Sequence, residues 1–249
     1  MKYKYKQSPI LEAVCQFRFD AGSPWDMAVP GLIYEQIKQN FPKRKQLKRI
    51  GVSLLATEDS FSPEVQAIDE IRFLREDEKV FLALSPHMLS VHVLKPYLSW
   101  ADFLPLIESG FETYSQIANP KALNRIGLRY VNKIEFGEAE TGDENKIELE
   151  DYFEFRPYMG DRLNQDYYSF SLSTDQALRN GRDNLKIRLT NESARKPRQI
   201  PIILDLDYST RQMSLDAVSN WVQEAHSAVY DAFEGCITEK LRKKLEPEK

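Results

Sequence analysis

Residues 214–245 read SLDAVSNWVQEAHSAVYDAFEGCITEKLRKKL, the longest regular pattern in this chain. Apolar residues recur in it at steps of three and four, the spacing of one face of an α-helix. Ser214 is a suitable N-cap, and the basic residues at 240–244 suit the C-terminal end of a helix dipole. The pattern predicts one continuous amphipathic helix of roughly 45 Å. Such a helix must lie across a sheet, cross between two lobes or contact another chain.

The composition is that of an ordinary globular protein. The chain has 249 residues, of which 42% are hydrophobic and 29% charged, with a net charge of −4. No apolar run approaches the roughly 20 residues that span a bilayer. The basic start at residues 1–6 is not followed by an apolar core, so we do not expect a secretory signal. Cys15 and Cys236 both lie in apolar patterns, which favours buried thiols over a disulfide. We therefore expect a cytoplasmic protein that is not associated with a membrane.

The first half of the chain alternates strand and helix patterns. Apolar alternation predicts a strand at 10–19, with Leu11 on the same face as Phe19. Short apolar runs separated by turn residues predict an antiparallel meander of four strands, at 47–56, 68–75, 80–84 and 88–94. Helical spacing predicts two helices, at 30–40 and, after the N-cap Ser99, at 100–117. A long strand is expected at 123–136.

The second half repeats this layout after an acidic segment. Residues 138–151 hold seven acidic residues and one lysine, which predicts a linker between lobes at 1–137 and 152–249. Strands are expected at 152–155, 167–173, 185–190 and 200–208. The predicted fold is α+β, with two antiparallel-sheet lobes, each covered by an amphipathic helix, closely packed into one unit. The recurrence reflects either an internal duplication or two uses of a common α+β layout.

Three stretches carry a family resemblance. They are SPILEAV at 8–14, RIGLRYVNKI at 125–134, and the helix from Trp221 through His226 to Arg242. Together they resemble a sporadically distributed family of bacterial conserved hypothetical proteins of similar length. The resemblance spans the whole chain, and it implies no established activity or cofactor. The patchy distribution of that family implies a setting among mobile, defence-linked or accessory genes.

The predicted strand at 123–136 holds the first candidate binding residues. Arg125, Arg129 and Lys133 share one face, where arginine could bind a phosphate or a carboxylate by bidentate pairing. The alternative is that these cations pair with acids on neighbouring strands. Asn132 stands on the other, apolar face. It is either a hydrogen-bonded core amide or the floor of a cleft.

Asp205 and Asp207 form a second candidate, because carboxylates two apart on a strand point the same way, as metal-dependent nucleases require. Lys186 and Arg188 alternate in the preceding predicted strand, which favours ordinary cross-strand pairing instead. The three histidines lack metal-ligand spacing, and no Walker loop, GxSxG or dinucleotide-binding glycine pattern is present. The sequence therefore predicts no metal, no cofactor and no catalytic residue.

A basic run is the third candidate. Lys43, Arg44, Lys45, Lys48 and Arg49 place five cations in seven positions, and residues 1–50 carry ten basic residues against four acidic ones. Such a patch could bind single-stranded nucleic acid or another anionic partner. The acidity of the remaining chain favours an acidic protein partner or a solvated turn.

These observations favour a non-catalytic binding or interaction protein, with the resemblance implying an accessory component of a bacterial defence or toxin–antitoxin type system. Its expected partner is another protein or a second copy of the chain. The alternative is an enzyme or binder acting on nucleic acid or nucleotides, with Arg125, Arg129, Asp205 and Asp207 as its polar groups. The two differ in one geometric respect: the alternative requires these four groups to line a common cleft.

Overall fold

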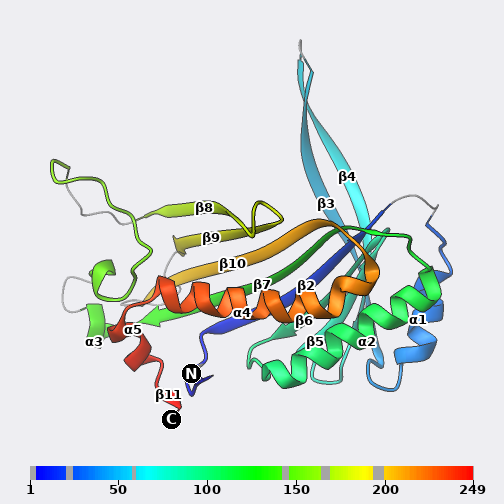
Figure 1. Ribbon diagram of the computed structural model, residues 1–249, viewed down its shortest axis with the longest axis horizontal. Helices are drawn as coiled ribbons and strands as arrows, with labels where there is room; N and C mark the ends of the chain where they lie inside the picture. The colour runs from blue at the N-terminus through cyan, green and yellow to red at the C-terminus, as the bar shows by residue number, and fades with distance from the viewer. Residues whose placement is uncertain are drawn as a thin grey trace.

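A computed structural model describes residues 4–20, 25–57, 60–141, 146–163, 169–192 and 199–248, with 49–57 and 60–68 as backbone alone. It confirms an α+β fold in which helices pack on a large antiparallel sheet (Figure 1). The strands are β1 (Lys4–Tyr5), β2 (Ile10–Phe19), β3 (Lys43–Thr57), β4 (Ser60–Leu74), β5 (Val80–Ser85), β6 (Met88–Leu94), β7 (Leu123–Phe136), β8 (Ser171–Leu178), β9 (Asp183–Asn191), β10 (Ile200–Met213) and β11 (Pro247–Glu248). The α-helices are α1 (Val29–Ile37), α2 (Trp100–Ala118), α3 (Glu138–Thr141), α4 (Val218–Cys236) and α5 (Glu239–Lys244).

The strands of both predicted lobes belong to the same sheet. In the part of the chain that the structure describes, nine strands pair in the order β3-β4-β5-β6-β2-β7-β10-β9-β8. β7 pairs with β2 along one edge and with β10 along the other, and both pairings are antiparallel. The prediction of a separate sheet for each lobe is therefore corrected to one continuous sheet. The long strand β7 joins the halves because both of its edges are paired.

The two halves of this sheet match in strand order. Reading outward from the β2–β7 pair, one half runs β2, β6, β5, β4 and the other runs β7, β10, β9, β8. In each half the strand that comes first along the chain, β2 or β7, pairs with the strand that comes last, β6 or β10. A long helix follows that last strand. These helices, α2 and α4, cover the same face of the sheet (Figure 1). α1 and β3 belong to the first half alone.

The sequence-predicted start of α2 is confirmed. Ser99 and Asp102 form a capping box in which each side chain binds the other residue's backbone N–H. Asn119, with φ of 45°, ends the helix in the left-handed conformation that asparagine tolerates well. Gly110 allows close packing on the sheet, since a Cβ there would lie 3.2 Å from Cγ2 of Val91.

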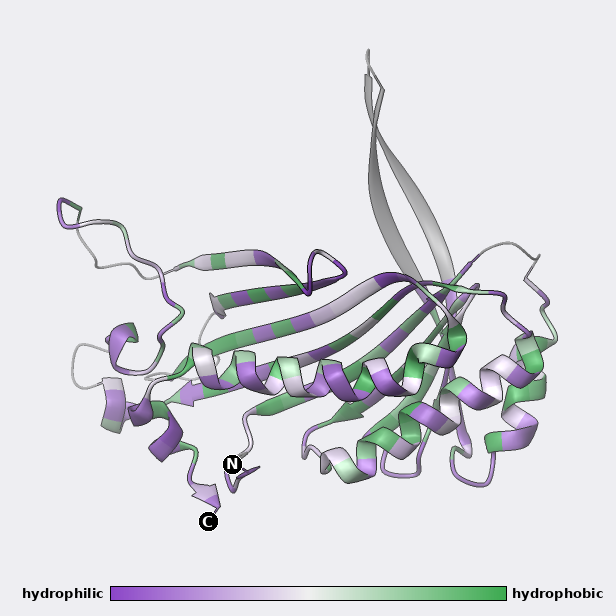
Figure 2. Ribbon diagram, viewed as in Figure 1, coloured by the Kyte–Doolittle hydropathy of each residue, from purple (hydrophilic) through white to green (hydrophobic). Residues whose placement is uncertain are grey.

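The predicted continuous helix at 214–245 is wrong in one respect. A 3₁₀ turn at Leu215–Ala217 leads into α4, and the helix then breaks at Ile237, which is extended, before α5 begins. Thr238 caps α5 by accepting a hydrogen bond from the backbone N–H of Leu241 at 3.3 Å. The chain at the break pairs with the segment around Phe153 instead of continuing as helix. α4 still alternates apolar and polar residues, as a helix with one buried face should (Figure 2).

The break depends on the segment that follows β7. Tyr152 O accepts from Thr238 N at 3.0 Å, and Glu154 N donates to Cys236 O at 2.9 Å. The strand predicted at 152–155 is thus reduced to a single bridge, between Phe153 and Ile237. Pairing across the break satisfies backbone groups that a continuous helix would have bonded internally.

The predicted acidic linker is anchored to the C-terminal helix where the structure describes it. Lys244 Nζ lies 2.5 Å from Glu140 Oε1, and Lys240 Nζ lies 2.6 Å from Asp151 Oδ2. Residues 142–145, at the centre of the predicted linker, lie outside the described residues. The basic end of the chain therefore pairs with acids on both sides of that gap. No helix in the described ranges is long and apolar enough to cross a membrane.

A bulge near the start of β2 changes the sheet face on which the first residues of this strand lie. The register of β2 on β7 shifts between Ile10, opposite Asn132, and Glu12, opposite Val131. Leu11 is consequently 39% exposed, not buried with Phe19 as the alternation predicts. The extra residue places Ile10 on the helix-covered face, where it lines the cleft described in the next subsection.

Candidate functional site

A cleft of about 620 Å³ opens between the N-terminal end of α2 and the middle of α4. This volume lies within the roughly 300–1,000 Å³ that is typical of small-molecule sites. Aromatic rings from four parts of the chain line it: Tyr5, Tyr97, Trp100, Tyr130, His226, Tyr230 and Phe233. Its lining includes residues of β2, β7 and β10, which are central strands of the sheet on the face that α2 and α4 cover (Figure 1). It is the candidate ligand site of this protein.

The floor of the cleft is the helix-covered face of the sheet. Ile10, Tyr130, Asn132 and Leu206 contribute to it from β2, β7 and β10. Asn132 is 2% exposed, and its Nδ2 donates to Leu204 O at 3.1 Å. Both sequence interpretations of Asn132 therefore apply, since it is a hydrogen-bonded core amide and also part of a cleft floor.

A hydrogen-bonded row of side chains crosses the deep part of the cleft. The hydroxyls of Tyr97 and Tyr130 lie 3.1 Å apart, and the Tyr130 hydroxyl is 3.4 Å from Nδ1 of His226. The His226 ring stacks on Trp100, with centroids 3.9 Å apart and planes 5° apart. Burial raises the pKa of Tyr97 to about 12 and that of Tyr130 well above its ordinary value. Both hydroxyls therefore stay protonated at neutral pH.

The two ends of the chain close one side of the cleft. β1 pairs with β11, so the first and last strands of the described chain lie side by side (Figure 1). Tyr5 donates from its hydroxyl to Glu234 Oε1 at 2.6 Å, and its ring meets Phe233 edge to face. Burial and the neighbouring Glu234 carboxylate raise the pKa of Tyr5. These contacts fix Tyr5 as a wall of the cleft.

The four polar groups of the alternative function lie elsewhere, on the sheet face opposite the helices. Arg125 Nη2 donates to both carboxylate oxygens of Asp207, at 2.8 and 3.0 Å. Arg129 makes two bonds of 2.7 Å to Asp205. None of the four lines the cleft. Each arginine instead neutralises one carboxylate.

Asp205 and Asp207 lie directly opposite Arg188 and Lys186 of β9, as the sequence predicts, but they form ion pairs with residues of the other neighbouring strand. Asp205 and Asp207 pair with arginines of β7, whereas the sequence favoured Lys186 and Arg188 of β9. Lys186 instead reaches Asp175 on β8, at 3.4 Å. The error arises because β10 has a neighbour on each edge, and both neighbours present alternating cations.

Gly127 leaves room for the Arg125–Asp207 pair. A Cβ at position 127 would lie 2.6 Å from Nη1 of Arg125, closer than real Cβ contacts. We expect Gly127→Ala to destabilise the wild-type protein by about 1 kcal/mol, because it displaces a partly exposed bidentate pair. In an Arg125→Ala background the same change should stabilise by about 0.5 kcal/mol, since alanine is favoured over glycine within a strand. Urea denaturation of the four proteins measures both effects, and equal effects in the two backgrounds would contradict this role for Gly127.

The remaining predicted binding residues are also engaged with acids. Lys133 Nζ lies 3.3 Å from Glu135 Oε1 and 4.0 Å from Glu192 Oε2 on the open face. Arg125, Arg129 and Lys133 therefore pair with acids of the protein, which was the alternative to binding a phosphate or carboxylate ligand. Among the described residues, no three histidine, cysteine or acidic side chains are grouped so that they could hold a metal.

The basic run lies on edge strand β3, not in a turn. Lys43 and Lys45 both pair with Glu78, and Arg44 lies over the ring of Tyr34 at 4.4 Å. Lys48 is exposed, and the side chain of Arg49 lies outside the described residues. Lys43 and Lys45 of this run therefore pair with an acid and Arg44 lies over a ring, and none of the run's described side chains lines the cleft.

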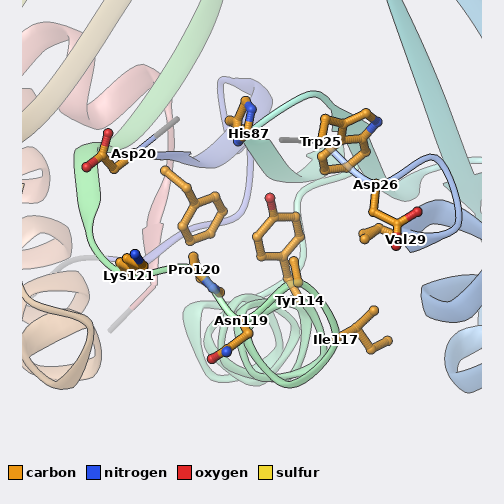
Figure 3. A pocket seen from close by; sticks show the side chains of 12 residues that line it. Asp20, Trp25, Asp26, Val29, His87, Tyr114, Ile117, Asn119, Pro120 and Lys121 are labelled. Atoms are coloured by element: carbon orange, nitrogen blue, oxygen red, sulfur yellow. The ribbon is translucent and has the colours of Figure 1, made fainter. Parts of the chain in front are cut away.

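A second, smaller hollow lies at the other end of α2. Its volume is about 160 Å³, and Trp25, His87 and Tyr114 contribute to its walls. Tyr114 directs its hydroxyl toward the turn that carries His87 (Figure 3). Burial raises the pKa of Tyr114 to about 12. This hollow is below the usual size of a small-molecule site, so the larger cleft is the stronger candidate.

Sequence reasoning found only Asn132 among the residues of the cleft's polar row and floor. Tyr97, Trp100, Tyr130 and His226 come from separate elements, and their spacing along the chain carries no common motif. Comparison with protein-family models, curated proteins and solved structures finds no match to this chain. The resemblance drawn from the sequence therefore stays a prediction.

Proposed function

We propose that this protein is a non-catalytic binding module and that the cleft between α2 and α4 is its binding site. One observation carries the proposal: a ring-lined cleft of about 620 Å³ has a buried amide, that of Asn132, on its floor. Small-molecule sites combine apolar and aromatic walls with a few fixed polar groups in this way. The Trp100–His226 stack and the hydroxyl row hold the walls in place without a ligand.

The tyrosine hydroxyls and the Asp102 carboxylate of the cleft suit binding better than catalysis. A general base requires a pKa near the working pH, whereas burial raises the pKa values of Tyr97 and Tyr130 away from neutrality. Asp102 is committed to the capping box of α2. Burial also raises the pKa of the Cys15 thiol, which keeps it a poor nucleophile.

The ion pairs on the sheet face opposite the helices support the binding module over the nucleic-acid alternative. The two arginines and two aspartates of that alternative form one-to-one ion pairs outside the cleft. Lys43 and Lys45, in the basic run, are partly neutralised by Glu78. A protein or homo-oligomeric partner, and an accessory role in a bacterial defence system, stay predictions.

We also infer that the two halves of the sheet descend from one duplicated strand-and-helix unit. The matching strand order on either side of the β2–β7 pair supports this inference. The helices α2 and α4 occupy equivalent places after β6 and β10. The cleft lies where the two units meet.

Binding to the cleft is testable with a dye that fluoresces when it leaves water. N-phenyl-1-naphthylamine is expected to bind saturably, with one molecule per protein. Ala101 is exposed at the cleft wall, so Ala101→Trp should fill the entrance and weaken binding by about tenfold or more, a loss of roughly 1.4 kcal/mol. Fluorescence titration measures both affinities.

Ser109→Trp is the matched control, because Ser109 is exposed on the same helix and does not line the cleft. It should leave the dye affinity unchanged. Equal affinities for the two tryptophan variants would place the dye elsewhere and count against the cleft as the binding site.

A further inference from the structure

The charged groups of the cleft lie at its exposed margin and already have partners. Lys4 and Asp102 are the charged residues among those that line it. Lys4 lies 3.6 Å from Glu248 with its side chain 74% exposed, and Asp102 accepts from the backbone N–H and hydroxyl of Ser99. An ionised group placed deeper would be buried without a counter-charge, which is costly.

The N-terminus of α2 does not offset this cost for an anion. Helix N-termini attract negative charge, but here the Asp102 carboxylate already occupies that position. The bonds from Ser99 lower the pKa of Asp102, so this carboxylate stays ionised at neutral pH and repels a second anion. The cleft therefore favours an uncharged ligand.

The walls favour a flat ligand. Trp100 and His226 present a stacked pair, while Tyr97 stands at 71° to Tyr130 and Tyr5 at 67° to Phe233. Rings held at steep angles offer both faces and edges to a further ring, and aromatic pairs favour offset-stacked and edge-to-face contacts. Contacts among these side chains already fix their rings, so little conformational entropy is lost when a planar molecule enters.

The floor of the cleft favours a ligand that carries a hydrogen-bond donor. One amide hydrogen of Asn132 is used by Leu204 O. The side-chain carbonyl oxygen of Asn132 accepts no hydrogen bond from the described residues, and Asn132 lines the cleft floor with only 2% of its surface exposed. A ligand that supplies an N–H or O–H would give this acceptor a hydrogen bond shielded from water.

We propose that the cleft takes an uncharged, planar aromatic molecule whose N–H or O–H group binds the side-chain carbonyl of Asn132. This inference rests on the proposed function, because it specifies the ligand of the same cleft. The proposed ligand therefore differs from nucleotides and other anions, which the arginines on the sheet face opposite the helices first suggested.

Three probes with matched rings test the proposal on the wild-type protein. N-phenyl-1-naphthylamine is neutral and carries an N–H. 8-Anilino-1-naphthalenesulfonate adds a negative charge to the same rings, and 1-phenoxynaphthalene replaces the N–H with an ether oxygen. We expect the neutral amine to bind about tenfold or more tightly than the sulfonate and about fivefold more tightly than the ether. Fluorescence titration gives the first two affinities, and displacement of the amine gives the third.

A variant then assigns the donor preference to one atom. Asn132→Leu keeps a similar volume and removes the carbonyl, so the amine should lose its preference over the ether. The wild-type comparison of the three probes decides the proposal even if this variant does not fold. Unchanged preference in a folded Asn132→Leu protein would overturn the assignment to Asn132.

The remaining outcomes separate this inference from the proposed function. If the sulfonate or the ether bound as tightly as the amine, and Ala101→Trp still blocked it, the ligand class would be wrong and the binding module would stand. If none of the three probes bound in a manner sensitive to Ala101→Trp, the inference and the proposed function would both fail.

Discussion

Replacing Trp221 with alanine is expected to lower the free energy of unfolding by about 3–5 kcal/mol. Trp221 is 2% exposed on α4, its ring lies 5.7 Å from that of Tyr208, and its Nε1 donates to Asp183 Oδ1 at 3.2 Å. The change removes a large buried ring and one donor to a buried carboxylate. Urea denaturation followed by circular dichroism measures the loss.

Gln223→Ala is the matched control, since Gln223 is exposed on the same helix. Surface changes of this kind alter stability by no more than about 0.5 kcal/mol. A loss of less than about 1 kcal/mol for Trp221→Ala would show that α4 contributes little to the core.

Asp183→Asn is expected to cost about 3 kcal/mol, because it breaks a buried charged network. Asp183 is 1% exposed at the start of β9. Its carboxylate accepts hydrogen bonds from Arg182 at 2.6 and 3.1 Å, Tyr208 at 2.7 Å and Trp221 at 3.2 Å. Asparagine would replace one acceptor with a donor that faces other donors. For a chain of this size the melting temperature should fall by roughly 6–12 °C.

The effect of Asp183→Asn should depend on pH. Burial opposes ionisation of Asp183, but the hydrogen bonds from Arg182, Tyr208 and Trp221 outweigh it and lower the pKa of this carboxyl. Its stabilising contribution is therefore fully present above its unfolded pKa of about 3.9 and is lost as pH falls through the lower folded value. The difference in melting temperature between wild type and Asp183→Asn should be constant near neutrality and shrink below about pH 4.

Asp175→Asn provides a control on the neighbouring strand, because Asp175 is exposed on β8. Its effect at neutral pH should stay within about 0.5 kcal/mol. If the difference caused by Asp183→Asn instead grew as the pH fell, the network would not hold Asp183 in its ionised form.

Local patterns predicted most strands and helices because they depend on neighbouring residues. Apolar alternation located β2, short apolar runs between turn residues located β5 and β6, and the Ser99 capping signal located the start of α2. The pairing of β7 with both β2 and β10 is long-range, and no local pattern specifies which strands meet. The helical spacing also continued through Ile237, because residues on both sides of the break are buried. The break itself depends on pairing with a distant segment around Phe153.

The candidate site was less predictable for the same reason. Asn132 could be recognised as a polar residue on an apolar face. The rings of Tyr97, Trp100 and His226 become neighbours only when α2, α4 and the sheet assemble. Two strands with similar cation spacing flank β10, so the sequence could not decide which one binds Asp205 and Asp207.

The pairing of β1 with β11 makes one wall of the cleft depend on both of these strands. Tyr5 is held at the cleft by Glu234 and Phe233, while Lys6 N bonds to Glu246 O at 3.0 Å and Gln7 N bonds to Leu245 O at 3.2 Å. A molecule clipped at either extremity keeps the nine-stranded sheet but loses the anchorage of this wall. Occupancy of the cleft should consequently fall when either of these two strands is removed.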